Sequence, residues 1–384
     1  MNNQEQGILI PASIDSLENL QVYSLLDNTS LDTVVLEREL TINSDEMIYF
    51  EGFINLFDVD HLNNIFLVIQ NPSQVGIKVF DSVGNYKTKI GRLGRGPGEF
   101  ESIGSIDIIN NKLYVLDTRL QKVVVYSTTD YSILSEQRIN KNETLDDEIT
   151  KIMRAREIFV ANNDKKLIKF ESNIGSNDFR RLHYYNLNDN GAITGRKVLD
   201  LKNYIQYIPD KELSLPINAP FSRNTLVAFS KTGMIFTSWN EQFLIKAYDL
   251  QGNYQYSFYY PYINSSLSVK SLGYDREELN VLEEYQLPDT WPALHTIEVS
   301  DDEKLWISTI TDSDSTYKWW VLNEQGKLQA TFSLPGIRNR RNVFKKPLIK
   351  INNGYLYEHD FDFEKGIDRI VKYKIIFKKR NKEN

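Results

Sequence analysis

Short runs of branched and aromatic residues, each bounded by a turn rich in Gly, Asn or Asp, recur along most of the chain. The stretch from 53 to 100 holds four such runs: Phe53–Asp58, Ile65–Gln70, Ile77–Asp81 and Tyr86–Ile90. Runs of this length and composition predict β-strands, and four of them joined by tight turns are typical of one blade of a β-propeller. The pattern therefore predicts an all-β fold.

Similar sets of strands follow at regular spacing. They begin near Phe53, Ile103, Met153, Ser222, His295 and Phe344. A period of about fifty residues indicates a propeller repeat, so we expect six four-stranded antiparallel blades. Two longer intervals hold insertions, a long loop at Asn203–Pro220 and the segment Tyr260–Leu294, which includes a charged helical stretch at Asp275–Tyr285. The last blade has three strands of its own, and we expect Asp32–Ile42 to supply the fourth and close the ring.

Composition is uniform along the chain, which favours a single domain. We expect an N-terminal extension at 1–30, one propeller at 31–377 and a basic C-terminal tail at 378–384. The hydrophobic fraction of 41% and the aromatic fraction of 12% are sufficient for a core of packed strands.

A glycine-rich stretch, Ile90–Phe100 (IGRLGRGPGEF), follows the first set of strands. Glycine tolerates positive φ, so this loop can carry the chain from one blade to the next, with Phe100 as a buried anchor. The stretch resembles the inter-blade loop of NHL-like repeats, and more closely the bacterial six-bladed β-propeller family, many of whose members are exported lipoproteins. The resemblance covers roughly residues 33 to 377 and implies a fold, not an activity. A phosphate-binding loop is disfavoured, because the Lys-Ser/Thr pair and a following helix are lacking.

Charge and composition exclude several classes of function. The net charge of −7 argues against general nucleic-acid binding, which needs a basic face. The absence of cysteine excludes disulfides, thiolate metal sites and a cysteine nucleophile. No apolar run approaches the about 20 residues of a transmembrane segment, and the first residues, MNNQEQG, lack the apolar core of a signal peptide. A location in the cell envelope is implied by the resemblance alone.

The inner strands of a propeller all begin on one face, around the mouth of the axial channel, and we name this the inlet face. The residues expected there are Glu51, Ser102, Arg154, Arg223, His295 and Lys346. A ring rich in basic groups would concentrate an anionic ligand. Arg95 in the glycine-rich loop suits carboxylate or phosphate, and Tyr262 in the second insertion is a candidate for an exposed aromatic contact. The alternative, that these charges pair with acidic loop residues, stays open.

A metal site is a second possibility. Glu51-Gly52 resembles the Glu-Gly of calcium-dependent propeller lactonases, in which the glutamate helps to hold the ion, and the resemblance implies a calcium-binding role for Glu51. A turn with an exposed acid is the favoured explanation of the pair, because a match of two residues carries little information. The four histidines form no short-spaced pair of metal-ligand type, and no nucleophile-elbow motif is present.

Three hypotheses for function follow. The first is a non-catalytic binding or scaffold protein that takes a small anionic ligand, a glycan or a partner loop at the inlet face and needs no cofactor. The second is a calcium-dependent propeller hydrolase or lyase such as a lactonase. The third is a structural protein of the cell envelope, which the sequence does not separate from the first.

Overall fold

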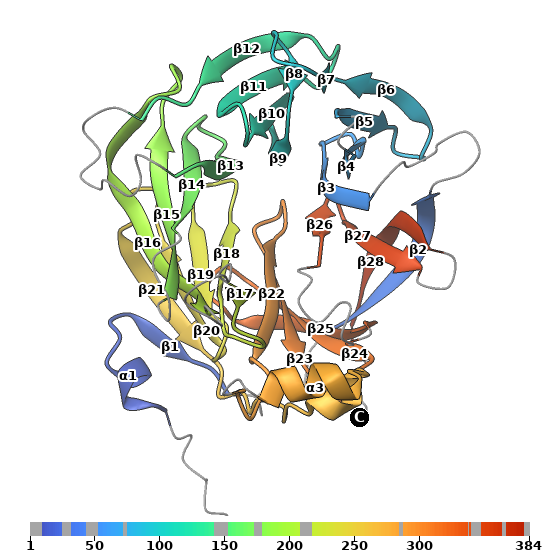
Figure 1. Cartoon of the computed structure of the whole chain (residues 1–384). Helices are drawn as coiled ribbons and strands as arrows, with labels where there is room; N and C mark the ends of the chain where they lie inside the picture. Colours follow the sequence, from blue (N-terminus) through green and yellow to red (C-terminus); the bar gives the residue numbers. More distant parts are fainter. Residues whose placement is uncertain are drawn as a thin grey trace, which may run out of the picture.

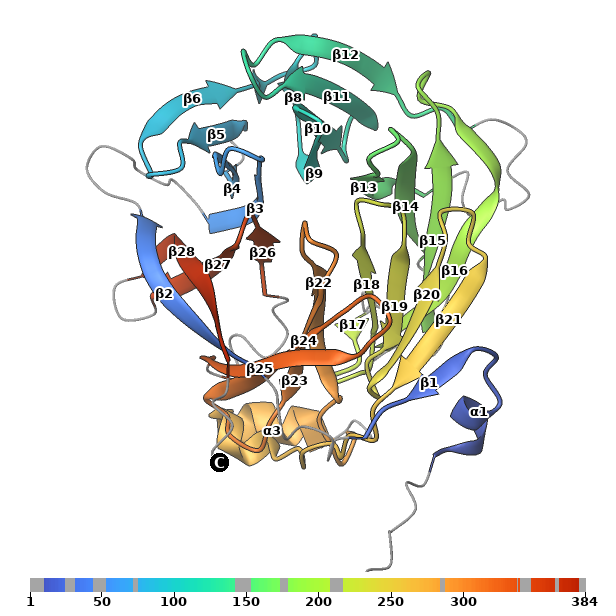
Figure 2. The ribbon, with the colours of Figure 1, turned by 180° about the vertical axis from the view of Figure 1, so that it is seen from behind.

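The computed structural model describes residues 10–24, 32–43, 53–71, 75–141, 153–172, 179–207, 217–283, 287–336, 338, 347–362 and 366–379. The strands radiate from a central axis as a ring of small antiparallel sheets, seen from one face in Figure 1 and from the other in Figure 2. The expected all-β, six-bladed propeller is therefore confirmed.

The first three blades follow one another along the chain. Blade 1 comprises β3 (Phe53–Val59), β4 (Ile65–Gln70), β5 (Ile77–Phe80) and β6 (Tyr86–Ile90). Blade 2 comprises β9 (Ile103–Ile109), β10 (Lys112–Asp117), β11 (Lys122–Ser127) and β12 (Ile133–Arg138). Blade 3 comprises β13 (Ala155–Val160), β14 (Lys166–Ser172), β15 (Phe179–Leu187) and β16 (Ile193–Tyr207), extended by β17 (Ile217–Asn218). Between blades 1 and 2, β7 (Arg92–Leu93) pairs with β8 (Glu99–Phe100) within the glycine-rich loop.

The other three blades complete the ring. Blade 4 comprises β18 (Thr225–Phe229), β19 (Ile235–Trp239), β20 (Leu244–Tyr248) and β21 (Tyr254–Tyr259). Blade 5 comprises β22 (Leu294–Val299), β23 (Leu305–Ile310), β24 (Thr316–Leu322) and β25 (Leu328–Pro335). Blade 6 comprises β26 (Ile349–Asn352), β27 (Tyr355–Asp362), β28 (Ile367–Lys378) and β2 (Asp32–Asn43). Among the described residues the helical elements are α1 (Ala12–Asp15), η1 (Val269–Leu272) and α3 (Arg276–Glu283), and α3 lies within the predicted helical stretch.

Strand β2 closes the ring as expected. It pairs antiparallel with β28 from Thr33 opposite Lys378 to Asn43 opposite Arg369. Its first two residues also pair in parallel with Ala330 and Thr331 of β25, so that blades 5 and 6 form one continuous sheet of eight strands. Both hydrogen-bonding edges of β2 are used, at least in part, which removes an edge open to other chains.

The core lies between neighbouring blades. Phe100 is fully buried between blades 1 and 2, which confirms its role as an anchor, and Trp306 is buried between blades 5 and 6. Gly91 makes the position of Phe100 possible: its φ is +73°, and a Cβ on it would lie 2.5 Å from the Phe100 ring. The glycine-rich loop is therefore a packing device between two blades.

Two local expectations need correction. The first insertion does not begin as a loop, because β16 continues to Tyr207 and pairs with β17. The exposed aromatic contact expected at Tyr262 is not found, because Tyr262 is partly buried and Tyr260, two residues before it, is 1% exposed. The reason is β1 (Leu20–Val22), which adds a parallel fifth strand to blade 4 and is followed by Tyr23, whose ring stacks on Tyr260 at 5.2 Å.

Candidate functional site

Ion pairs join charged side chains of different blades near the ends of the inner strands away from the inlet face. Lys350 Nζ lies 3.4 Å from Asp58 Oδ1, and Lys231 of blade 4 is ion-paired with Asp107 of blade 2. Each carboxylate also accepts a backbone N–H of the next inner strand, Asp58 from Ile108 (2.8 Å) and Asp107 from Val160 (2.6 Å). The Asp58 carboxylate raises the pKa of Lys350. These charges connect blades and are already paired.

Arg223, at the start of blade 4, is mostly buried, with 9% of its side chain exposed. It is ion-paired with Glu241, and its Nη2 donates to Thr290 Oγ1 (3.0 Å) and the Trp291 carbonyl (3.3 Å). Arg223 is therefore paired with an acidic residue, which is the alternative that the sequence left open. Its main contacts fasten the second insertion to blade 4.

His295, at the start of blade 5, stacks on Tyr317 with ring centroids 4.3 Å apart. Burial, together with the positive charge of Arg338, lowers the pKa of His295 to about 4. Arg338 is itself 3% exposed and lies against the Trp291 and Tyr317 rings. His295 is therefore neutral at pH 7 and adds no charge to a ring around the channel.

The other predicted residues are dispersed. Arg95 is 79% exposed on its side chain and pairs with Glu101. Tyr262 is partly buried against Phe243 and donates its hydroxyl to the Ile310 carbonyl (2.7 Å).

Arg154 is the one basic residue of the predicted ring that is exposed within the described part of the chain, since Lys346 and the predicted metal ligand Glu51 lie outside the described residues. Burial, and then the positive charge of Arg154, lower the pKa of Lys141. The structure thus leaves less basic charge at the channel mouth than the sequence suggested.

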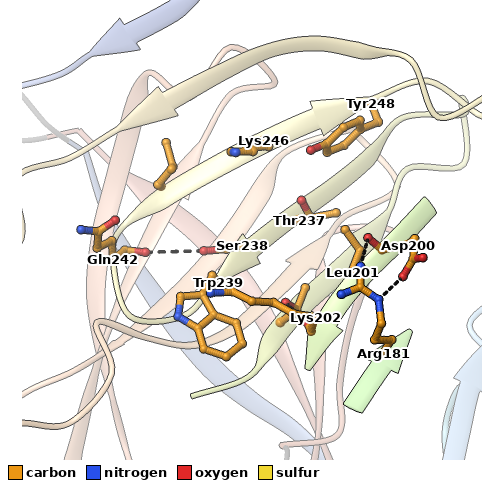
Figure 3. A pocket seen from close by; sticks show the side chains of 12 residues that line it. Arg181, Asp200, Leu201, Lys202, Thr237, Ser238, Trp239, Gln242, Lys246 and Tyr248 are labelled. Carbon is orange, nitrogen blue, oxygen red and sulfur yellow. Dashed lines mark hydrogen bonds and ion pairs between the residues drawn. The ribbon is translucent and has the colours of Figure 1, made fainter. Parts of the chain in front are cut away.

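A pocket of about 440 Å³ lies between blades 3 and 4 (Figure 3). Its blade 3 side is formed by Arg181, Asp200, Leu201 and Lys202. Its blade 4 side includes Thr237, Ser238, Trp239, Gln242, Lys246 and Tyr248. The Trp239 end lies at the inlet face, because Trp239 is paired with Thr225, the first residue of β18. Its volume lies within the range of about 300–1,000 Å³ common for small-molecule sites.

Two lysines give this pocket its electrostatic character. Lys202 Nζ lies 3.8 Å from the centroid of the Trp239 ring, and burial lowers the pKa of Lys202. Lys246 is opposite Thr237 on β19, and no carboxylate of the described residues forms an ion pair with its ammonium group or with that of Lys202. Figure 3 shows Lys202 beside Trp239, with Thr237 and Lys246 farther along blade 4.

The only carboxylate in the described lining, Asp200, is already neutralised at one end of the pocket. Its Oδ1 accepts from Arg181 Nε (2.6 Å) and its Oδ2 from Lys197 Nζ (3.0 Å). The His183 ring nitrogen Nδ1 lies 3.4 Å from the same carboxylate. The remaining positive charge is carried by Lys202 and Lys246, so the pocket favours an anion.

Only a weak signal for this site is present in the sequence. In Leu244–Tyr248, Ile245 and Ala247 are buried in the core, and Lys246 therefore points to the opposite face of β20. That alternation identifies a polar face but not what it opposes. The facing side chains come from β15 and β16, and only the packing of blade 3 against blade 4 brings the two sets together.

Comparison with known proteins agrees with the fold. Residues 53–212, which span blades 1 to 3, match the model of the family DUF5128, described as a 6-bladed beta-propeller. A Bacteroides fragilis protein described as exported is similar at 13% identity, over 94% of this chain and 99% of the other, with a TM-score of 0.50. A DUF4221 family member from Bacteroides vulgatus is similar at 11% identity, over 90% and 99%, with the same TM-score. No curated protein matches the sequence.

These similarities confirm the expected likeness to bacterial six-bladed propellers, and at such low identity they speak to the fold alone. No group of three or more acidic or histidine side chains suited to a metal ion occurs among the described residues. In the same part of the chain, none of the helices has the length and apolar character needed to cross a membrane.

Proposed function

We propose that this six-bladed β-propeller is a non-catalytic binding protein that takes a small anionic ligand in the pocket between blades 3 and 4. The observation that supports the proposal is the pair of lysines, Lys202 and Lys246, which line the same pocket and form no ion pair with a carboxylate of the described residues. Glu241, the carboxylate whose charge acts on Lys202, is itself ion-paired with Arg223. Lys202 is exposed and Lys246 is half-buried, so a bound anion would meet two accessible cations that no ion pair neutralises.

The pocket replaces the channel mouth as the main binding site in this proposal. The two share the inlet face, and Arg154 remains an exposed cation there that can attract an anionic ligand from a distance. Arg223, His295, Arg95 and Tyr262 hold the fold around that face through the contacts described above.

The competing proposal is a calcium-dependent hydrolase or lyase, and it rests on the Glu51-Gly52 pair alone. Unfolding temperatures measured with chelator and then with excess calcium separate the two. A ligand present at a hundred times its dissociation constant stabilises a protein by about 2.7 kcal/mol. A calcium-dependent rise of that size, lost in Glu51→Gln, would favour the enzyme.

A place in the cell envelope belongs to the proposal as well. It is supported by the sequence resemblance to exported lipoproteins and by the similar Bacteroides fragilis protein described as exported. A small-ligand receptor in that compartment fits a propeller whose charged pocket opens to one face.

The direct test is calorimetric titration with small carboxylates and phosphates, on the wild type and on Lys246→Gln. We expect at least one anion to bind the wild type and to lose at least tenfold in affinity in the variant. The matched control is Lys318→Gln, which changes a lysine lying 4.5 Å from the Trp320 ring on blade 5. Equal anion affinity in all three proteins would refute the site.

A further inference from the structure

The neutral side chains of the blade 3–blade 4 pocket are informative about its ligand. Three of them come from β19 and β20: Thr237 and Ser238 carry hydroxyls, and Tyr248 carries a phenol. Gln242, in the turn between these strands, adds a side-chain amide. Each of these groups can both donate and accept a hydrogen bond, whereas an anion accepts only. The lining is therefore suited to a ligand that bears hydroxyl groups in addition to charge.

The arrangement of these groups follows from the strand pairing. Thr237 lies opposite Lys246, and Ile235 lies opposite Tyr248, so Lys246 and Tyr248 are on the same face of β20. Trp239 is two residues from Thr237 and shares its face of β19. Diagonal neighbours on a sheet face are about 7–8 Å apart. A ligand that contacts both Lys246 and the Lys202–Trp239 pair therefore reaches from one position of the sheet face to its diagonal neighbour and to blade 3.

The type of cation that lines the pocket indicates which kind of anionic group the ligand carries. Arginine binds phosphate through a two-pronged contact, and the arginine of the described lining, Arg181, already donates from Nε and Nη2 to Asp200. The available cations are lysines, which act as point charges. Singly charged carboxylates spaced along a hydroxyl-rich ligand match two separate ammonium groups better than one compact dianion.

Apolar surface completes the site. Leu201 and Leu244 line the pocket, and Trp239 contributes an indole that Lys202 covers on one face. Sugar rings present C–H groups beside their hydroxyls, so a pocket that alternates indole, leucine and hydroxyl side chains satisfies both parts of such a ring.

We infer that the ligand is an acidic saccharide, a short chain of sugars bearing carboxylates, with its carboxylates at Lys202 and Lys246 and its hydroxyls at Thr237, Tyr248 and Gln242. This inference rests on the proposed anion-binding function and specifies its ligand class. Two lysines from different blades, together with neutral hydrogen-bonding groups in the same pocket, are the features that support it.

The experiment is a calorimetric titration with four probes: trigalacturonate, neutral maltotriose, glucose 6-phosphate and inorganic phosphate. The proteins are the wild type, Lys246→Gln, Thr237→Val and the control Lys318→Gln. We expect trigalacturonate to bind the wild type at least tenfold more tightly than the other probes. Lys246→Gln should weaken it at least tenfold and Thr237→Val about threefold to tenfold, because removing one hydrogen-bonding group costs about 1 kcal/mol. Lys318→Gln should leave it unchanged.

The possible outcomes distinguish a failure of the saccharide inference from a failure of the proposed anion-binding function. If either phosphate binds more tightly than trigalacturonate and depends on Lys246, the pocket binds anions but the saccharide inference is overturned. If maltotriose binds as tightly as trigalacturonate, the carboxylates play no part and the inference is overturned. If no probe or other anion depends on Lys246, the proposed function falls as well. A circular dichroism spectrum and unfolding temperature for each variant show that it is folded.

Discussion

Glu358 of blade 6 provides a test of how burial controls the stability of this propeller. It lies in the middle of β27, opposite Val371 of β28 and Ile349 of β26. Burial, and then the negative charge of Asp360 two residues away, raise the pKa of Glu358 from 4.5 to about 7. A carboxyl group whose pKa is higher in the folded state binds its proton more tightly there. It therefore stabilises the fold below about pH 4.5, and this stability is lost as the pH rises to about 7.

The magnitude follows from linkage. One pKa unit corresponds to 1.36 kcal/mol, and for these two pKa values the free energy of unfolding falls by about 2.5 kcal/mol between pH 5 and pH 8 on account of this residue. Glu358→Gln cannot ionise and lacks this loss. We therefore expect the variant to gain about 2.5 kcal/mol relative to the wild type as the pH is raised from 5 to 8.

Urea denaturation at both pH values measures the effect. The control is Glu37→Gln on β2, which makes the same chemical change at an exposed position of the same blade. The difference between Glu37→Gln and the wild type should not change with pH. If the difference for Glu358→Gln is also constant to within about 0.5 kcal/mol, its carboxyl group is solvated in the folded protein and the reasoning is wrong.

Two further predictions concern packing and charge. Gly91→Ala should lower the free energy of unfolding by about 2–4 kcal/mol more than Gly354→Ala does. Both glycines have φ near +75°, but only at Gly91 does an added Cβ collide with the Phe100 ring. Urea denaturation measures both losses, and equal losses would mean that the Phe100 ring moves aside. Arg338→Met should raise the pKa of His295 above about 4, because it removes a neighbouring positive charge, and an NMR titration of the imidazole that shows no rise would assign the low pKa to burial alone.

Much of the fold was readable from the sequence because propeller turns use local chemistry. Asp81 illustrates this: its carboxylate accepts the backbone N–H of Val83 and Asn85, hydrogen bonds within the turn between β5 and β6 that the local sequence alone specifies. The closing strand was predictable for a different reason. Asp32–Ile42 has a clear strand pattern and no partner nearby in sequence, and blade 6 lacked one strand.

The binding residues were harder to predict, because their environment depends on contacts between distant segments. Arg223 reads as a free cation until Glu241 and Trp291 are placed beside it. Lys202 and Lys246 belong to different blades, and each alone resembles any lysine of an exposed strand. Periodicity reports which face of a strand is buried, but it does not report which blade lies against that face.

The place of β2 in blade 6 has a consequence for how the chain folds during its synthesis. During synthesis this strand leaves the ribosome early, whereas β28, its main partner, is made almost last. Blade 6 therefore cannot assemble until nearly the whole chain has been translated, and until then β2 and the flank of blade 5 are left without their partners. Contacts of such long sequence separation form slowly, and unpaired strands can aggregate while they wait. The same pairing that seals the finished ring therefore leaves its precursor with unpaired strands until translation is almost complete.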